Sequence, residues 1–237
     1  MTDHASQYDL AEIIQKSIWF QNIPAQGLDK LVQSAQVKHF SPRQYLYQVG
    51  EKTASIYCLL SGRLRISIIS SSGQEFALDD LAPQYWLGHF SLVDEDSRIQ
   101  EAQVQVAANI LVVPRAALLD VGEKYPVLYK NLFYDSVRRA RQMSGLLAGM
   151  AFYSLRARLA GRILDLILHH GVEQELGICL DIKLSQNDFA RLCLGSRQRV
   201  NKIFREWTEM GILGMHCDRY LIYDTAALQR EIVTEES

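Results

Sequence analysis

Five polar side chains lie close together near residue 200, and their types suit the reading of nucleic-acid bases. They are Arg197, Gln198, Arg199, Asn201 and Lys202. An arginine guanidinium can donate to both acceptors on the major-groove edge of guanine, and asparagine or glutamine amides match the donor and acceptor of adenine. In a recognition helix, the side chains of the first turns are those that reach base edges. The group therefore predicts contacts to double-stranded DNA.

The residues between these polar side chains predict the helix that positions them. Four apolar residues recur at steps of three and four, which places them on one stripe of a helix: Val200, Ile203, Phe204 and Trp207. Because successive residues turn by about 100° in a helix, the polar group is expected on the side away from that stripe, with Arg199 at the margin. A helix that buries the stripe in a core presents the polar group to solvent.

Two serines mark where a pair of helices begins. Ser185 has Asp188 three residues later, which is the spacing of a capping box, and Ser196 can cap the second helix. Ser185, Gln186 and Ser196 complete the predicted DNA-contacting set. Residues 185–205 contain five Lys or Arg and one Asp, a local net charge of +4, although the whole chain carries −2. This local charge suits a phosphate backbone.

Upstream of this helix pair the spacing of apolar residues changes twice. Residues 9–38 have roughly helical spacing. Between residues 45 and 114, short apolar runs and period-two alternation are broken by turn signals, which predicts an antiparallel roll or barrel. Helical spacing returns over residues 125–150, with no proline after Pro126, and predicts a helix of about 24 residues, or roughly 36 Å.

The long helix is expected to find a partner. A helix of that length beside a small roll usually pairs with a second helix, which predicts a homodimer. The alternative is a single helix packed on its own roll. Further along, residues 155–169 read as a helix, residues 178–184 as a strand, and residues 220–223 as a strand that forms a wing. Arg156 or Arg158 is a candidate phosphate contact.

Other features bear on compartment and on metal binding. The first ten residues are polar, and no apolar run approaches the roughly 20 residues of a membrane span. The four cysteines are scattered, without the spacing of zinc ligands: Cys58, Cys179, Cys193 and Cys217. We therefore expect a cytoplasmic protein with no membrane partner, no metal site and thiols that are buried or incidental.

Over nearly its whole length the sequence resembles the CRP/FNR family of bacterial regulators. The segment LGSRQRVNKIFREWTEMGIL (194–213) is similar to the family's recognition helix, with Arg197 at its leading base-reading arginine and Gln198 where many members carry Glu. IYCLLSGRLRI (56–66) and GQEFALDDLAP (73–83) are similar to its β-roll. The resemblance implies homodimers that bind palindromic operators and contact RNA polymerase.

The fold class implied is α+β, in three parts. An antiparallel β-roll of the double-stranded β-helix or jelly-roll type, with a helical lead-in, would form an effector or sensor domain over residues 1–122. A dimerisation helix and hinge would follow over residues 123–153. A winged helix-turn-helix DNA-binding domain would span residues 154–237.

The resemblance also implies an effector pocket, around Gly88, His89 and Arg98. Cyclic-nucleotide binders hold the ribose with a Gly-Glu pair and the phosphate with an Arg-Ser or Arg-Thr pair. Here the first pair reads Gly88-His89, and the second falls near Gln100 and Glu101, whose charge would repel a phosphate. Cyclic AMP is therefore not predicted. No cysteine cluster precedes Cys58, as an iron–sulfur member would need. Haem binding through His89 is not excluded, and the sequence does not identify the small-molecule effector.

Two alternatives to a DNA-binding regulator belong to other classes. One is an interaction protein whose helix-turn-helix no longer binds DNA. The intact polar face around Arg197 argues against this alternative. The other is a cupin-like enzyme with a metal inside the roll, which needs clustered histidines and carboxylates. His89 is the only histidine of the roll after His39, and there is no HxH pair. The sequence therefore predicts no catalytic residues.

Overall fold

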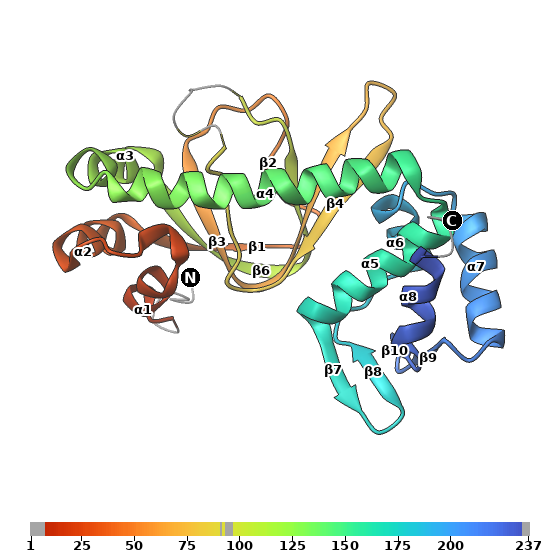
Figure 1. The fold of residues 1–237 in the computed structure, drawn as a ribbon. Coiled ribbons are helices and arrows are strands. Elements are labelled where there is room, and N and C mark those ends of the chain that lie inside the picture. Colours follow the sequence, from red (N-terminus) through yellow and green to blue (C-terminus); the bar gives the residue numbers. More distant parts are fainter. Residues whose placement is uncertain (1–7, 91, 93–96, 234–237) are drawn as a thin grey trace. The chain divides into compact units, whose positions relative to one another are not determined.

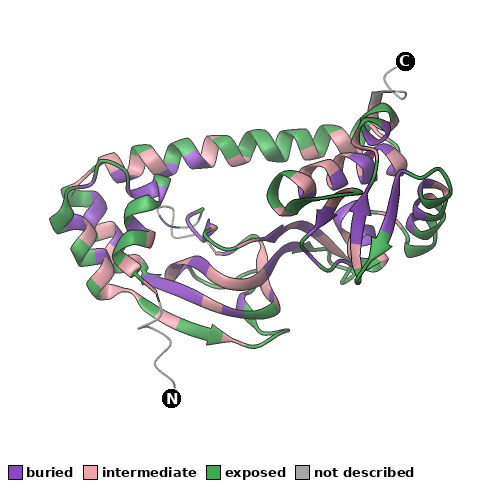
Figure 2. Cartoon of the chain, turned by 90° about the horizontal axis from the view of Figure 1, so that it is seen from below, coloured by how far each residue is buried: buried purple, intermediate pink, exposed green. Residues whose placement is uncertain are grey.

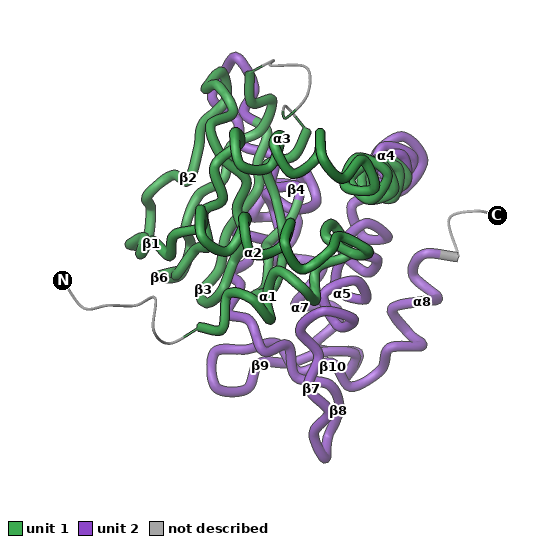
Figure 3. Tube along the Cα trace, turned by 90° about the vertical axis from the view of Figure 1, so that its left-hand side faces the viewer, with its two compact units in different colours: residues 1–68, 79–142 green, residues 69–78, 143–237 purple. Residues whose placement is uncertain are grey.

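The computed structural model describes residues 8–90, 92 and 97–233. The chain divides into two compact units, one of residues 1–68 with 79–142 and one of residues 69–78 with 143–237 (Figure 3). Among the described residues, no helix is both long enough and apolar enough to span a membrane.

An antiparallel sheet dominates the first unit. Its strands run in the order β1-β6-β3-β4, with β2 paired to β6 and β5 paired to β3. The register between β3 and β6 shifts near Ser61, where bulges bend both long strands (Figure 1). The antiparallel roll predicted from alternation is confirmed. The strands are β1 (Gln36–Phe40), β2 (Tyr45–Tyr47), β3 (Ser55–Ile69), β4 (Glu75–Leu81), β5 (Trp86–Leu87) and β6 (Glu101–Pro114).

Short helices precede and follow these strands. They are α1 (Leu10–Lys16), the 3-10 helix η2 (Ile18–Phe20), α2 (Ala25–Ser34) and α3 (Arg115–Lys124). The core that they share with the sheet includes Trp19, Phe20 and Trp86, whose rings make edge or tilted contacts. The helical interpretation of residues 9–38 is wrong at its end. Residues 36–38 belong to β1, because pairing with β6 satisfies their backbone groups better than one more helical turn.

Helix α4 (Val127–Phe152) is 26 residues long and confirms the predicted long helix. Its buried residues are Leu128, Leu132 and Asp135, all in the first half. The second half is exposed or intermediate throughout (Figure 2). Only part of one face of α4 is therefore covered by its own chain.

Four helices and a small sheet follow α4 in the described part of the chain and form most of the second unit. The helices after α5 (Leu155–His170) are α6 (Gln186–Leu192), α7 (Arg197–Glu209) and α8 (Thr225–Val233). The sheet order is β7-β8-β10-β9, in antiparallel pairs. Its strands are β7 (Gly171–Gln174), β8 (Gly177–Leu180), β9 (Leu213–His216) and β10 (Arg219–Ile222). The strand predicted at 178–184 is shorter than expected, because the chain turns at Asp181 toward α6.

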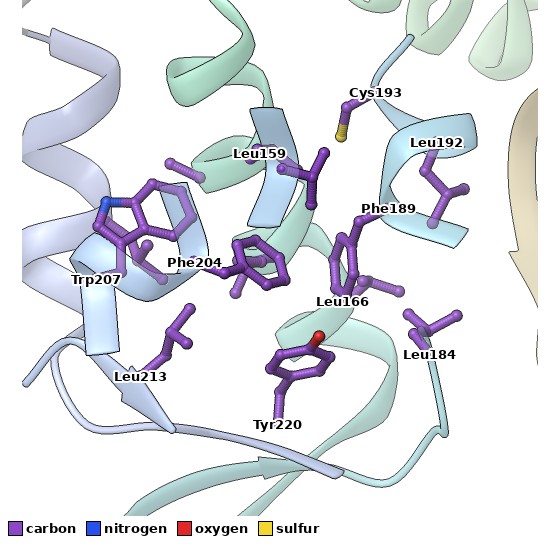
Figure 4. Close-up of a cluster of buried hydrophobic side chains, with 14 of the residues drawn as sticks. Leu159, Leu166, Leu184, Phe189, Leu192, Cys193, Phe204, Trp207, Leu213 and Tyr220 are labelled. Carbon is purple, nitrogen blue, oxygen red and sulfur yellow. The ribbon is translucent and has the colours of Figure 1, made fainter. Parts of the chain in front are cut away.

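Aromatic side chains fill the core of the second unit. Phe189 of α6 makes edge contacts with Phe204 of α7 and Tyr220 of β10, and Phe204 stacks on Trp207 (Figure 4). Residues 69–78 also belong to this unit, where Ala77 is fully buried in the same core. The stripe on α7 is thus fixed by packing against α6 and the sheet.

Candidate DNA-binding interface

The start of α6 has the predicted capping box. The Ser185 hydroxyl accepts a hydrogen bond from the backbone N–H of Asp188 at 3.2 Å, and the Asp188 carboxylate accepts one from the N–H of Ser185 at 2.8 Å. Two backbone donors that the helix cannot satisfy internally are therefore bonded. The box fixes where α6 begins.

The turn between α6 and α7 is tight. Leu194 adopts a positive φ of 48°, and the backbone N–H of Gly195 donates to the carbonyl of Ala190. A methyl group on Gly195 would come within 2.6 Å of Leu155 Cδ1, so the close approach of α5 requires glycine here. The Ser196 hydroxyl accepts from the N–H of Arg199 at 3.3 Å and caps α7.

The two faces of α7 divide as the sequence predicts. Val200, Phe204 and Trp207 are at most 3% exposed. The predicted base-reading and backbone-contacting side chains, apart from the partly exposed Gln186, are exposed; they are Ser185, Ser196, Arg197, Gln198, Arg199, Asn201 and Lys202. The structure therefore brings the predicted set together at the start of α7 and beside the start of α6.

Three of the five cations in this segment have no acidic partner among the described residues: Arg197, Arg199 and Lys202. The other two are paired. Arg191 contacts Glu75 at 2.9 Å, and Arg205 lies 3.7 Å from Glu209 on the next turn. Unpaired exposed cations at a helix start, where the helix dipole is also positive, create an anion-attracting surface.

Arg156, one of the two candidate phosphate contacts, is ion-paired within the second unit. Its guanidinium contacts Glu206 at 2.5 Å and Glu231 at 2.6 Å, and it lies over the Trp207 ring at 5.3 Å. The Trp207 indole also donates to Glu231 at 3.0 Å. These bonds lower the pKa of Glu231 and raise that of Arg156. Sequence reasoning missed this cluster, because its members are 50 and 75 residues from Arg156.

The predicted wing is a hairpin of β9 and β10. Tyr220 pairs with Met215, and Cys217 and Asp218 form the turn with φ of 47° and 60°. Arg219, just after the turn, contacts Asp181 at 2.9 Å. The hairpin β7–β8 pairs with the wing through β10, and it was missed because all four residues of β7 are exposed and leave no alternating pattern.

In the roll, two of the three predicted effector residues contact each other. The Arg98 guanidinium donates to the carbonyls of Gly88 and Ser55, each at 2.7 Å, and lies 4.3 Å from the centre of the Tyr47 ring. Arg98 is 5% exposed. Its two terminal nitrogens are thus occupied by backbone carbonyls.

His89, the third predicted residue, is directed to another neighbourhood. Its ring lies 4.6 Å from that of Trp19, and Nε2 is 3.8 Å from the Asp135 carboxylate on α4. Neither ring nitrogen has a hydrogen-bond partner within the described part of the chain. Burial, followed by the nearby charge of Arg139, lowers the pKa of His89 to about 3. The imidazole is therefore neutral at physiological pH.

Asp135 joins the helical lead-in to α4. It accepts hydrogen bonds from the Trp19 indole at 3.0 Å, from Arg138 at 2.7 Å and from Arg139 at 2.7 Å. Burial opposes ionisation of Asp135, but the charge of Arg139 and these hydrogen bonds prevail and lower its pKa. The carboxylate is therefore ionised, although it is fully buried.

These contacts do not fit a cyclic nucleotide. At the ribose position stands His89, which faces Trp19 and Asp135. The phosphate position carries the anionic Glu101 at the start of β6, and Arg98 is bonded to backbone carbonyls instead. In the described residues, no group of three His, Cys, Asp or Glu side chains could hold a metal ion.

Both halves of the chain match known family models. The cyclic nucleotide-binding domain matches residues 37–125, and the Crp-like helix-turn-helix domain matches residues 157–231. The chain belongs to the CRP/FNR family. It is a transcription regulator of the CRP/FNR type, with a DNA-binding helix-turn-helix.

Relatives match it over most of its length. A CRP-like cAMP-activated global transcriptional regulator of Mycobacterium tuberculosis (strain CDC 1551 / Oshkosh) is 24% identical over 92% of this chain and 98% of the relative. The anaerobic regulatory protein of Bacillus subtilis (strain 168) is 22% identical over 79% and 80%. FixK2 from Bradyrhizobium japonicum superposes with a TM-score of 0.74 at 15% identity, covering 83% of this chain and 96% of that one. The CRP/FNR chain thus has the fold of its family, while its roll departs from the nucleotide-binding pattern.

Proposed function

We propose that this CRP/FNR regulator binds a palindromic operator as a homodimer, with α7 in the major groove. The observation that carries the proposal is the exposed start of α7, where Arg197, Arg199 and Lys202 have no acidic partner in the described structure and Gln198 and Asn201 stand between them. Their chemistry matches base edges and phosphates. Residues 154–237 would form the DNA-binding domain.

A heptad seam on α4 supports the homodimer. Six residues recur at alternating steps of four and three: Phe133, Val137, Ala140, Ser144, Leu147 and Ala151. Phe133 is 71% exposed and Leu147 is 69% exposed, although both are large and apolar. Such spacing is that of the a and d positions of a coiled coil, and small residues allow two helices to approach closely. The partner that this seam fits is a second copy of α4, which assigns residues 123–153 to dimerisation and hinge.

Selection of random duplex DNA by the purified protein, without added ligand, tests the proposal. An enriched inverted repeat with half-sites about one helical turn apart is expected. Arg197→Ala should weaken binding to the selected site by about 5- to 100-fold and relax the preference at one base position of each half-site, because a bidentate base contact contributes about 1–3 kcal/mol.

Arg205→Ala is the matched control. Arg205 is exposed on the same helix, and its acidic neighbour is Glu209, about one turn further along. Its loss should leave the base preference unchanged. If Arg197→Ala selects the same sequence as the natural protein, Arg197 does not read a base. Absence of binding even at low salt, from a folded protein, would support the DNA-silent alternative.

The effector pocket around Gly88, His89 and Arg98 stays a prediction. Contact with RNA polymerase follows from the family resemblance, and a cytoplasmic location is the one that such a regulator requires. An effector would act by binding one arrangement of α4 more tightly than another, which shifts the population that binds DNA.

A further inference from the structure

A cleft of about 370 Å³ lies outside the roll, within the first unit. Three segments line it together with Cys58 of β3: α1 and η2, residues 84–86 before and within β5, and the middle of α4. Trp19, Trp86 and Cys58 are buried lining residues, while Ile13 and Ile18 lie toward the solvent side. Its volume is within the range of small-molecule sites, and its walls combine aromatic, apolar and charged groups.

The α4 side of the cleft carries more positive than negative charge. Arg138 and Arg139 both bond to the single carboxylate of Asp135. All three nitrogens of Arg139 are used, since it also donates to the Tyr85 hydroxyl at 2.5 Å and to the carbonyl of Trp86 at 2.7 Å. Arg138 uses Nε and Nη2, and its Nη1 has no partner among the described residues. At the mouth, Lys16 and Glu12 neutralise each other.

Two hydrogen-bond donors in the cleft can therefore bind an anion. One is Nη1 of Arg138, whose side chain is 49% exposed. The other is the Tyr85 hydroxyl, which accepts from Arg139 and keeps its own proton for a second acceptor. Burial raises the pKa of Tyr85, so this proton stays in place at physiological pH.

The cleft remains open in the proposed homodimer. Asp135 is two residues from Val137 and lies about 160° from it around α4. Arg138 and Arg139, one residue from Val137 and Ala140 respectively, lie about 100° from the seam. A partner helix on the seam therefore leaves the cleft accessible. The three segments that line the cleft include the helix that forms the seam, so a ligand held here contacts the dimerisation helix directly.

We propose that this cleft binds a small organic carboxylate with an aromatic body, whose carboxylate is held by Arg138 and Tyr85 and whose ring packs among Trp86, Ile13 and Ile18. This proposal names the chemical class of an effector and places its site outside the roll. The regulatory role of the ligand rests on the proposed function. Binding itself does not depend on DNA.

Isothermal titration calorimetry with the full chain, without DNA, tests the site. Indole-3-acetate is the probe, and its uncharged analogue indole-3-acetamide is the matched ligand. We expect saturable binding of the acid that is about tenfold or more tighter than that of the amide, because a charge-assisted hydrogen bond is lost. Arg138→Gln should weaken acid binding by about tenfold, and Tyr85→Phe by about fivefold, while Arg141→Gln, an exposed arginine on the same helix, should have no effect.

Three results would overturn the assignment: no saturable heat with the acid, equal affinity for the amide, or unchanged affinity in Arg138→Gln. Thermal unfolding checks that each variant is folded. Operator binding by the natural chain, measured separately, distinguishes the two proposals. Retained operator binding with no acid binding removes only the cleft, whereas acid binding without operator binding removes only the regulator.

Discussion

At the scale of single residues, the buried imidazole of His89 makes stability depend on pH. It is neutral in the folded state, where its pKa is about 3, and Asp135, Arg139 and Arg98 are the charged groups that influence it. An unfolded histidine has a pKa of about 6.5. Between these values the unfolded chain binds a proton that the folded chain does not, so the contribution is complete above about pH 6.5 and is lost as the pH falls.

We predict that His89 alone removes about 2 kcal/mol of unfolding free energy between pH 7.5 and pH 5. Asp135 and Glu231, whose pKa values are lowered, lose their contributions only at more acid pH. Urea unfolding at both pH values measures the effect. His89→Leu should flatten the dependence, while His216→Gln, an exposed histidine, should leave it unchanged. If the unfolding free energy of His89→Leu depended on pH as strongly as that of the natural chain, the buried neutral imidazole would be contradicted.

The exposed polar face of α7, proposed to contact DNA, could be predicted from the sequence because its pattern lies within one helix. Capping, stripe and polar face around Arg197 are all local patterns, and the structure reproduces each one. The partners of Arg156 and of Asp135 could not be predicted. Trp19 and Asp135, for example, are 116 residues apart, and only the fold brings the indole to the carboxylate.

At the scale of elements, the turn between α6 and α7 depends on close packing against α5. We predict that Gly195→Ala destabilises the second unit by about 1–3 kcal/mol, because the new methyl group displaces the buried Leu155 side chain. Gly145→Ala provides a contrast. Gly145 lies within α4 with nothing within 4 Å of an added methyl, so this change should stabilise the chain by about 0.5–1 kcal/mol.

Denaturant unfolding at one protein concentration compares the two variants. The free energy of unfolding is expected to fall in Gly195→Ala and to rise in Gly145→Ala, although both add the same methyl group. An unchanged free energy of unfolding in Gly195→Ala would mean that Leu155 moves aside without cost. The positive φ of Leu194 would then determine the shape of the turn.

In helix α4, the spacing of apolar residues predicts the helix but not which of them its own chain buries. The sequence predicted one helix with apolar residues at steps of three to five, and the helix is confirmed. Its apolar residues, however, form two stripes. Leu128 and Leu132 are buried by their own chain, whereas Val137, Ala140 and Leu147 lie on the heptad seam. A single sequence cannot separate these stripes, because which face the roll covers depends on long-range packing.

At the scale of the whole molecule, the seam is expected to control DNA binding through dimerisation. We predict that Leu147→Lys raises the dimer dissociation constant by about 100-fold or more. In the proposed dimer each Leu147 would bury its side chain, a contribution of about 1.5–3 kcal/mol, and the dimer would contain two. Analytical ultracentrifugation over a concentration series measures the constant. Gln142→Lys adds the same charge to the same helix at an exposed position off the seam, and should leave the dimer intact.

Loss of the dimer has a specific consequence for DNA. A monomer reaches one half-site at a time, so it loses the gain that comes from tethering two recognition helices. The affinity of Leu147→Lys for the full inverted repeat should therefore fall close to its affinity for an isolated half-site, while its half-site affinity stays that of the natural chain because α7 is unchanged. A monomeric variant that still prefers the full repeat would show that contacts other than the α4 seam join the two copies on DNA.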